Sequence, residues 1–176
     1  MASAAKKASA APASSPEAIA EAVTEIYRGP AWHGPSVRAA LRGVTAAQAS
    51  WRPAPGRNSI HDLVLHLIYT RHRMIGRLQS VQGGRSARFP RPMRSSWYPR
   101  GPARLDEATW SEDLKLLERY QDSVLAALAG TDPATLALRR RGSARTVGAE
   151  LMGMAFHDAY HAGQIRMLAL MAPKKR

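Results

Sequence analysis

The chain has 176 residues and is 45% hydrophobic, which is sufficient for one domain with a substantial core. It contains no cysteine, which excludes disulfides and cysteine-ligated metal sites, and no apolar run reaches the ~18–20 residues of a membrane span. The formal net charge is +13, from 26 Lys+Arg against 13 Asp+Glu, and such an excess favours acidic partners or substrates.

The predicted elements begin after an Ala/Ser-rich basic tail at residues 1–15, which is expected to be disordered and lacks the apolar segment of a signal peptide. A cytoplasmic protein is therefore expected. One helical domain follows at residues 16–172, and a short basic tail at 173–176 ends the chain. The helices are predicted, in chain order, at 16–27, 36–41, 59–79, 105–129 and 143–171, and a turn capped by Thr45 is predicted at 45–50.

Turn-forming residues separate these helices, and a turn is expected at residues 131–133. Thr45 is a suitable N-cap, and either Asn58 or Ser59 can cap the helix at 59–79. Residues 84–104 are rich in Pro, Arg, Gly and Ser and are predicted to form a loop longer than compact domains usually carry. No segment alternates with period two, so the sequence predicts an all-α bundle of three or four long helices.

The basic residues are concentrated in two segments. No acidic residue occurs between Asp62 and Asp106, where nine arginines fall, and four more arginines lie within residues 139–145. Such patches attract phosphates and other anions, but a solvated basic surface has the same composition. No nucleic-acid-binding motif accompanies the charge, which favours the solvated surface.

The last predicted helix carries two histidines one turn apart, in the segment FHDAYHAGQI. At about 100° per residue, Glu150, Gly153 and Gln164 share the stripe of His157 and His161. We expect this polar stripe to lie at the centre of the inward face, where its members need each other, another partner or a metal. A histidine pair at this spacing is a common metal chelator, but a hydrogen-bonded or exposed pair is an equally good interpretation.

The helix predicted at 59–79 offers a third ligand, because His66 is a polar residue among buried apolar ones. Asp62, one turn earlier, either orients the His66 ring or caps the helix, and capping is slightly favoured. His61 and His72 point elsewhere and are expected to be surface or packing residues. His33 precedes a short helix, so capping or packing explains it as well as chemistry does.

These segments resemble one known family. The combination of SIHDLVLHL with GMAFHDAYHAGQIRML, about ninety residues later, is similar to the metal-binding four-helix bundles of the DinB/YfiT-like superfamily. The segments AWHGPSV and ALRGVTAAQASWRPAPG resemble one subgroup closely. The resemblance covers roughly residues 23–171.

The resemblance implies an up-and-down four-helix bundle with a divalent metal held by His66, His157 and His161. Relatives include S-transferases that use a low-molecular-weight thiol, a mycothiol-dependent isomerase, and proteins described as metal-dependent hydrolases. The chain departs from the family in its Arg/Pro-rich 84–104 loop and at Thr70, where relatives often have Trp. Both positions border the site in the family.

The expected function is therefore that of a metal-dependent enzyme acting on a small molecule, with anionic compounds among the candidates. Its metal, Zn, Ni, Mn or Fe, would activate either a thiol cosubstrate or a water. Glu150 and Gln164 are candidate catalytic residues, or else hydrogen-bond partners of the ligands, and Tyr69 and Arg73 are candidate substrate-binding residues.

The alternative function is that of a non-catalytic protein whose Arg-rich face binds nucleic acid or another polyanion. For either function no membrane partner is expected, and a homodimer is possible.

Overall fold

The computed structural model describes residues 15–93, 95 and 104–173. Apart from Ser15 and Pro173, the tails predicted at 1–15 and 173–176 lie outside the described residues, as do positions 94 and 96–103 of the predicted loop. None of the described helices is long and apolar enough to cross a membrane. The helices are α1 (Pro16–Arg28), α2 (Val37–Leu41), α3 (Ala46–Ser50), α4 (Ile60–Val81), α5 (Glu107–Ala129), α6 (Pro133–Ala137) and α7 (Val147–Met171).

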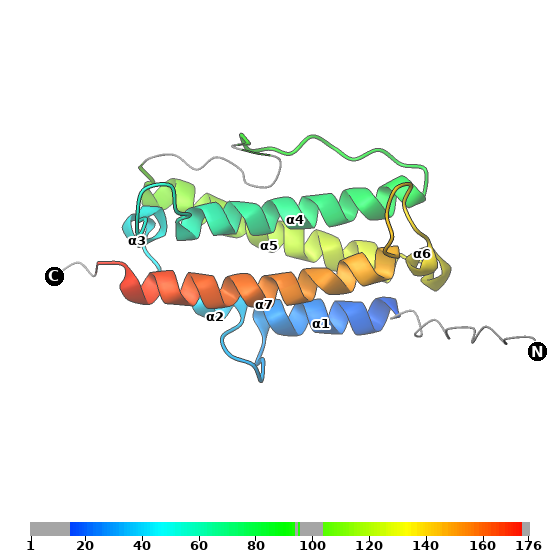
Figure 1. The fold of residues 1–176 in the computed structure, drawn as a ribbon, viewed down its shortest axis with the longest axis horizontal. Helices are drawn as coiled ribbons and strands as arrows, with labels where there is room; N and C mark the ends of the chain where they lie inside the picture. Colours follow the sequence, from blue (N-terminus) through cyan, green and yellow to red (C-terminus); the bar gives the residue numbers. More distant parts are fainter. Residues whose placement is uncertain (1–14, 94, 96–103, 174–176) are drawn as a thin grey trace, which may run out of the picture.

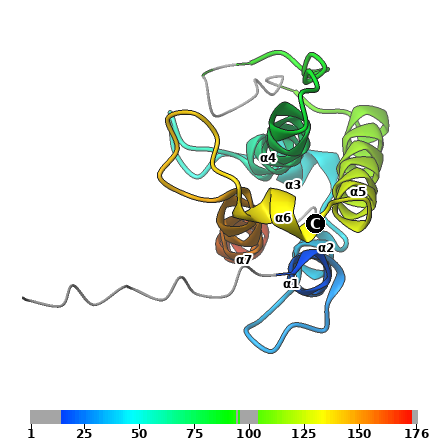
Figure 2. The ribbon, with the colours of Figure 1, turned by 90° about the vertical axis from the view of Figure 1, so that its right-hand side faces the viewer.

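The four long helices, α1, α4, α5 and α7, lie around a common core and confirm the predicted all-α bundle (Figure 1, Figure 2). α4 packs against α5 and α7, and α1 packs against the same two helices. Buried side chains fill the space between them in two clusters, one around Ile68 and Leu117 and the other around Val23 and Leu151. The short helix α3 lies at one end of the bundle and α6 at the other, and α2 packs against α7 beside α1 (Figure 1).

The long helices do not alternate in direction, which corrects the predicted up-and-down order. α4 and α5 run parallel, because His61 contacts Asp113 near their starts and Arg71 contacts Gln121 farther along both. α1 and α7 run the opposite way (Figure 1). The order is therefore up, down, down, up. A parallel pair needs a connection that returns along the bundle, and the chain between α4 and α5, which contains the predicted 84–104 loop, serves this purpose.

The helix boundaries follow local capping chemistry. Thr45 and Ser59 form capping boxes at the starts of α3 and α4, which confirms Thr45 and selects Ser59 over Asn58. The predicted turn at 131–133 leads directly into α6, a short helix that the sequence analysis missed. α7 begins at Val147 rather than near residue 143, because Thr146 is its N-cap and pairs with Arg139 in an isolated bridge.

A fully buried arginine joins all four long helices. Arg71 of α4 has no exposed surface and binds Gln121 of α5, at 2.9 Å, and Asp158 of α7. Its guanidinium lies 4.9 Å from the ring centroid of Tyr27 on α1, and it also donates to the carbonyl of Leu67. A buried charge without partners is strongly unfavourable, so these contacts fix the helices relative to one another.

A second polar cluster fastens the start of the crossover connection to the bundle. The Arg91 guanidinium binds Asp113 Oδ1 through two nitrogens, at 2.9 and 2.7 Å, and His61 Nε2 lies 2.8 Å from Asp113 Oδ2. Two residues earlier, the Phe89 ring packs at 5.1 Å from the ring of Tyr69. His61 is 2% exposed, so it is a packing residue, one of the two roles predicted for it.

Removing the buried cation should destabilise the whole bundle. We expect Arg71→Met to lower the free energy of unfolding by about 3–5 kcal/mol, because Asp158 would remain buried without its partner. Adding Asp158→Asn to the same chain should recover part of this loss. Urea unfolding measures both effects, and Arg145→Met, at an exposed position, is the matched control. Equal stability of the Arg71 and Arg145 variants would contradict this role.

The anchor at Asp113 should make stability depend on pH in the acid range. Burial raises the pKa of Asp113, but hydrogen bonds from His61 and Arg91 outweigh it, and the net pKa is lowered. Such a carboxylate contributes stability above its unfolded pKa, about 4, and this contribution is lost as the pH falls through the lower folded value. Below about pH 4, Asp113→Asn should therefore lose stability less steeply than the unmodified chain.

Urea unfolding at a series of pH values measures these slopes. Asp122→Asn makes the same chemical change at an exposed carboxylate of the same helix and serves as the control. Parallel pH profiles for the unmodified chain and Asp113→Asn would show that the anchor does not contribute.

Candidate metal centre

Three histidines from two antiparallel helices converge between α4 and α7. His66 Nε2 lies 2.9 Å from His157 Nε2, which lies 3.0 Å from His161 Nε2. One ligand atom from each residue falls within 4.8 Å of the other two, a group that could hold a metal ion. His66 and His161 are buried, whereas the His157 side chain is 30% exposed, so the group borders solvent on one side.

Neighbouring polar side chains hold two of these rings by their outer nitrogens. His161 Nδ1 donates to Gln164 Oε1 at 2.7 Å, and Gln164 Nε2 donates to the Tyr160 hydroxyl at 2.9 Å. His157 Nδ1 lies 3.4 Å from Asp158 Oδ1, and the other oxygen of this carboxylate binds Arg71. With Nδ1 engaged as a donor, the lone pair of a neutral ring is on Nε2, the atom that faces the other histidines.

The chemistry of these donors suits a divalent cation. Burial, followed by the effect of the neighbouring His157, lowers the pKa of His161 to about 4. The ring is therefore neutral near pH 7 and can donate a lone pair. Three imidazoles without a fourth protein ligand are a donor set that leaves coordination positions for water or substrate. The residues present therefore fit a metal ion.

The other predicted site residues fall into two groups. Gln164 touches His161 directly, so its observed contact is that of a residue that positions a ligand. Glu150 lies two turns before His157 and pairs with Arg77 and Arg140, at 3.4 and 3.6 Å, so the structure does not bring it to the three histidines.

The predicted substrate-binding pair lies on the turns of α4 that follow His66. The Arg73 guanidinium is 5.8 Å from the ring centroid of Tyr69, and both residues are half-buried. Between them, Thr70 donates a hydrogen bond to the carbonyl of His66 at 3.0 Å. Binding of substrate by Tyr69 and Arg73 stays a prediction.

Two further predictions concern acidic and imidazole groups outside the three histidines. Asp62 accepts hydrogen bonds from Ser59 and Arg52, so the favoured capping role is confirmed. His33 is exposed beside Trp32 and does not belong to the group of three.

Sequence analysis missed Arg71 and Asp158, the pair that supports the His157 ring. A signal was available, since Asp158 is a carboxylate in an otherwise apolar stretch and a buried carboxylate requires a cation.

The predicted orientation of α7 was also wrong. Its inward face contains Leu151, Asp158 and Ile165, whereas Tyr160 and Met167 are more than 60% exposed. The histidine stripe therefore lies at the edge of the packed face and not at its centre. α7 is apolar around nearly its whole circumference, so periodicity alone could not orient it.

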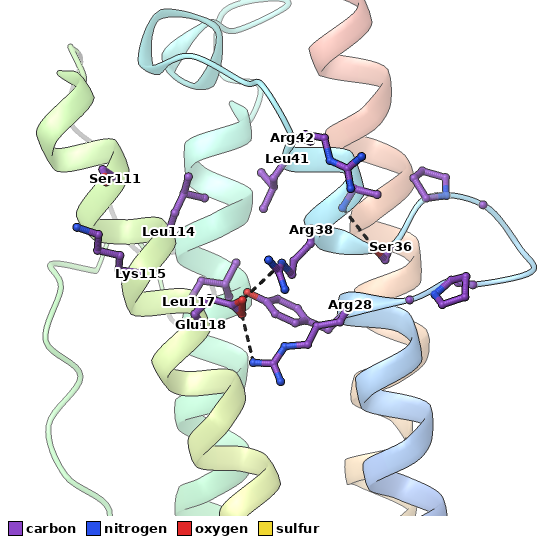
Figure 3. A pocket seen from close by; sticks show the side chains of 17 residues that line it. Arg28, Ser36, Arg38, Leu41, Arg42, Ser111, Leu114, Lys115, Leu117 and Glu118 are labelled. Carbon is purple, nitrogen blue, oxygen red and sulfur yellow. Dashed lines mark hydrogen bonds and ion pairs between the residues drawn. The ribbon is translucent and has the colours of Figure 1, made fainter.

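A sizeable cavity lies away from the three histidines. It has a volume of about 870 Å³ and lies between α1, α2 and α5, as Figure 3 shows. Arg28, Arg38 and Lys115 line it, and Glu118 pairs with both arginines at 3.6 and 3.5 Å. None of the three histidines contributes to this cavity, so the candidate metal centre between α4 and α7 is separate from it.

Comparison with known proteins supports the resemblance drawn from the motifs. The chain matches none of the curated proteins or solved structures with which it was compared. A family model described as the DinB superfamily matches residues 32–165, which is more than half of the chain and includes all three histidines. The chain belongs to the DinB superfamily.

Proposed function

We propose that this chain is a metal-dependent enzyme whose three-histidine centre activates a thiol or a water toward a small molecule. The observation that carries this proposal is the convergence of three histidine Nε2 atoms, one of them from His157, whose side chain is partly exposed to solvent. A purely structural metal site is usually closed by a fourth protein ligand, whereas this group has three members and borders solvent.

The chain's own residues have distinct parts in this proposal. His66, His157 and His161 would hold the ion, Zn, Ni, Mn or Fe, and Gln164 and Asp158 would keep two of these rings oriented. A divalent ion so held lowers the pKa of a thiol or water that it binds.

The state of the nearby carboxylates supports the thiol version more than the water version. Asp158 is buried against Arg71, and Glu150 is paired with Arg77 and Arg140. Neither is free to act as a general base toward a bound water. A metal-bound thiol is deprotonated without a separate base, and because the chain has no cysteine the thiol would be a low-molecular-weight cosubstrate. Arg73, beside Tyr69, would meet an anionic substrate group.

The polyanion-binding alternative gains less support from the described residues. Arginines from both basic segments are engaged in ion pairs within the fold, among them Arg71 with Asp158, Arg91 with Asp113, and Arg140 with Glu150. Such arginines are not available to phosphates without loss of an internal contact.

The centre should bind one divalent ion per chain through its histidines. We expect His161→Ala to lose stoichiometric metal, and Gln164→Leu to weaken metal affinity about 10–100-fold by releasing the His161 ring. Elemental analysis and competitive metal titration measure these effects. His33→Ala, a histidine change outside the group, should bind metal as the unmodified chain does. A folded, unmodified chain that cannot be loaded with any of the four metals would exclude the centre.

The metal-loaded chain should catalyse thiol conjugation. A screen of several cellular thiols against small electrophiles should show turnover that depends on both thiol and metal and is lost in His157→Ala. Because Arg73 lies on α4 beyond His66 and carries a positive charge, Arg73→Met should raise KM for an anionic electrophile more than for a neutral one. Hydrolysis that proceeds without thiol would select the water version, and no turnover of either kind by the loaded protein would contradict the proposal.

A further inference from the structure

One side of α7 carries large apolar residues that face solvent. α7 lies at a corner of the bundle, and Figure 2 shows no other helix beside its outer side among the described residues. These side chains have the highest exposures of the large hydrophobic residues on this helix. They are Phe156 at 70%, Tyr160 at 64%, Met167 at 63%, Leu170 at 61% and Met171 at 56%.

The spacing of this outer face is that of a helix-pairing seam. Its positions alternate in steps of three and four residues, the heptad spacing that keeps one stripe facing a partner helix. The seam consists of Gly153, Phe156, Tyr160, Gly163, Met167 and Leu170. Within α7 after Glu150, Asp158 is buried and Arg166 is the only exposed charged residue. In a chain of net charge +13, this face is therefore nearly free of the repulsion that acts elsewhere.

The exposed area is large for a monomer. At about 200 Å² for each large side chain, the exposed fractions of the four large seam residues amount to roughly 500 Å². Single chains rarely expose more than a few hundred Å² of contiguous apolar surface, and a standard interface buries about 800 Å² on each partner. The seam supplies most of that area, and its rim can supply the remainder.

We propose that the seam binds a second copy of this chain, with the two α7 helices antiparallel. The twofold axis would cross the seam between Tyr160 and Gly163, midway along the helix. The order of large and small residues favours this arrangement. It places Tyr160 against Gly163 of the other copy, and Leu170 against Gly153, so that these two large side chains meet glycines with open space around them, while Phe156 lies against Met167. A parallel pair would place each glycine against its own copy and leave gaps.

The seam reaches the candidate metal centre through one residue. Tyr160 lies near the middle of the seam, and its hydroxyl accepts the hydrogen bond from Gln164, which holds His161. The Tyr160 and His161 ring centroids are 5.1 Å apart. A second copy over Tyr160 would shield this chain of contacts from water and so support the His161 ring. This consequence rests on the proposed function, whereas the pairing itself does not.

Mass in solution tests the pairing. Sedimentation equilibrium should give twice the chain mass, and Met167→Glu should weaken self-association roughly a hundredfold or more, because each dimer would bury two carboxylates against apolar side chains. Leu170→Glu should act in the same way. Trp32→Glu, at a residue that is 91% exposed and lies outside the seam, should remain dimeric. Circular dichroism verifies that all variants are folded.

Three results would overturn the proposal: a monomeric unmodified chain, dimers that persist in both seam variants, or dissociation of the Trp32 control as well. None of these measurements depends on metal or turnover, so failure of the pairing and failure of the proposed function are distinguishable. A chain that is monomeric alone but binds a different protein through this face would equally exclude self-pairing.

Cross-linking tests the antiparallel arrangement. Because the chain has no cysteine, a single introduced thiol can form a disulfide only with another copy. In the proposed register Phe156 lies against Met167 of the other copy. Co-expressed Phe156→Cys and Met167→Cys chains should therefore form a mixed disulfide, and neither variant should cross-link efficiently alone. Efficient cross-linking of each variant with itself would indicate a parallel pair instead.

Discussion

The buried ion pair between Arg71 and Asp158 is the interaction on which the rest of the structure depends. Both side chains are at most 1% exposed, so neither charge can be satisfied by water, and each must find its partner inside the bundle. Apolar contacts alone tolerate small rotations and sliding of helices, since one methyl group can replace another. A buried charge does not tolerate them, and this pair therefore sets the rotation of α7 against α4. The same carboxylate borders His157, so the interaction that fixes the bundle also fixes a candidate ligand.

The direction of the helices follows from a second constraint of the same kind. α4 and α5 are parallel neighbours, which requires the chain to return along the bundle between them. The first part of this return segment is attached to the bundle, because Arg91 binds Asp113 and Asp113 also binds His61. Phe89 is thereby held against Tyr69, one turn after His66. The described part of this connection thus contacts the helix that carries His66 through one aromatic pair.

Sequence reasoning located the elements better than it oriented them. The caps at Thr45 and Ser59 and all three histidines were identified because these features depend on local chemistry or a specific motif. The short helix α6 was missed because five residues leave no periodicity to detect. The up, down, down, up order could not be derived, since it depends on which helix ends a loop joins in space. The rotation of α7 was predicted wrongly for a different reason. A helix that is apolar on nearly all sides has no single apolar stripe that identifies its inward face.

The apolar residues of α7 have different surroundings on its different sides. One side packs into the core through Leu151 and Ile165, and the edge of that side holds His157 and His161. The outer side, with Phe156 and Met167, has no partner among the described residues, although exposure of such side chains is costly. Selection for folding alone would place polar residues there, as it does on the outer side of α5. The proposed second copy accounts for this difference, and it explains why two glycines lie among the large residues of this face, in a helix that they would otherwise weaken.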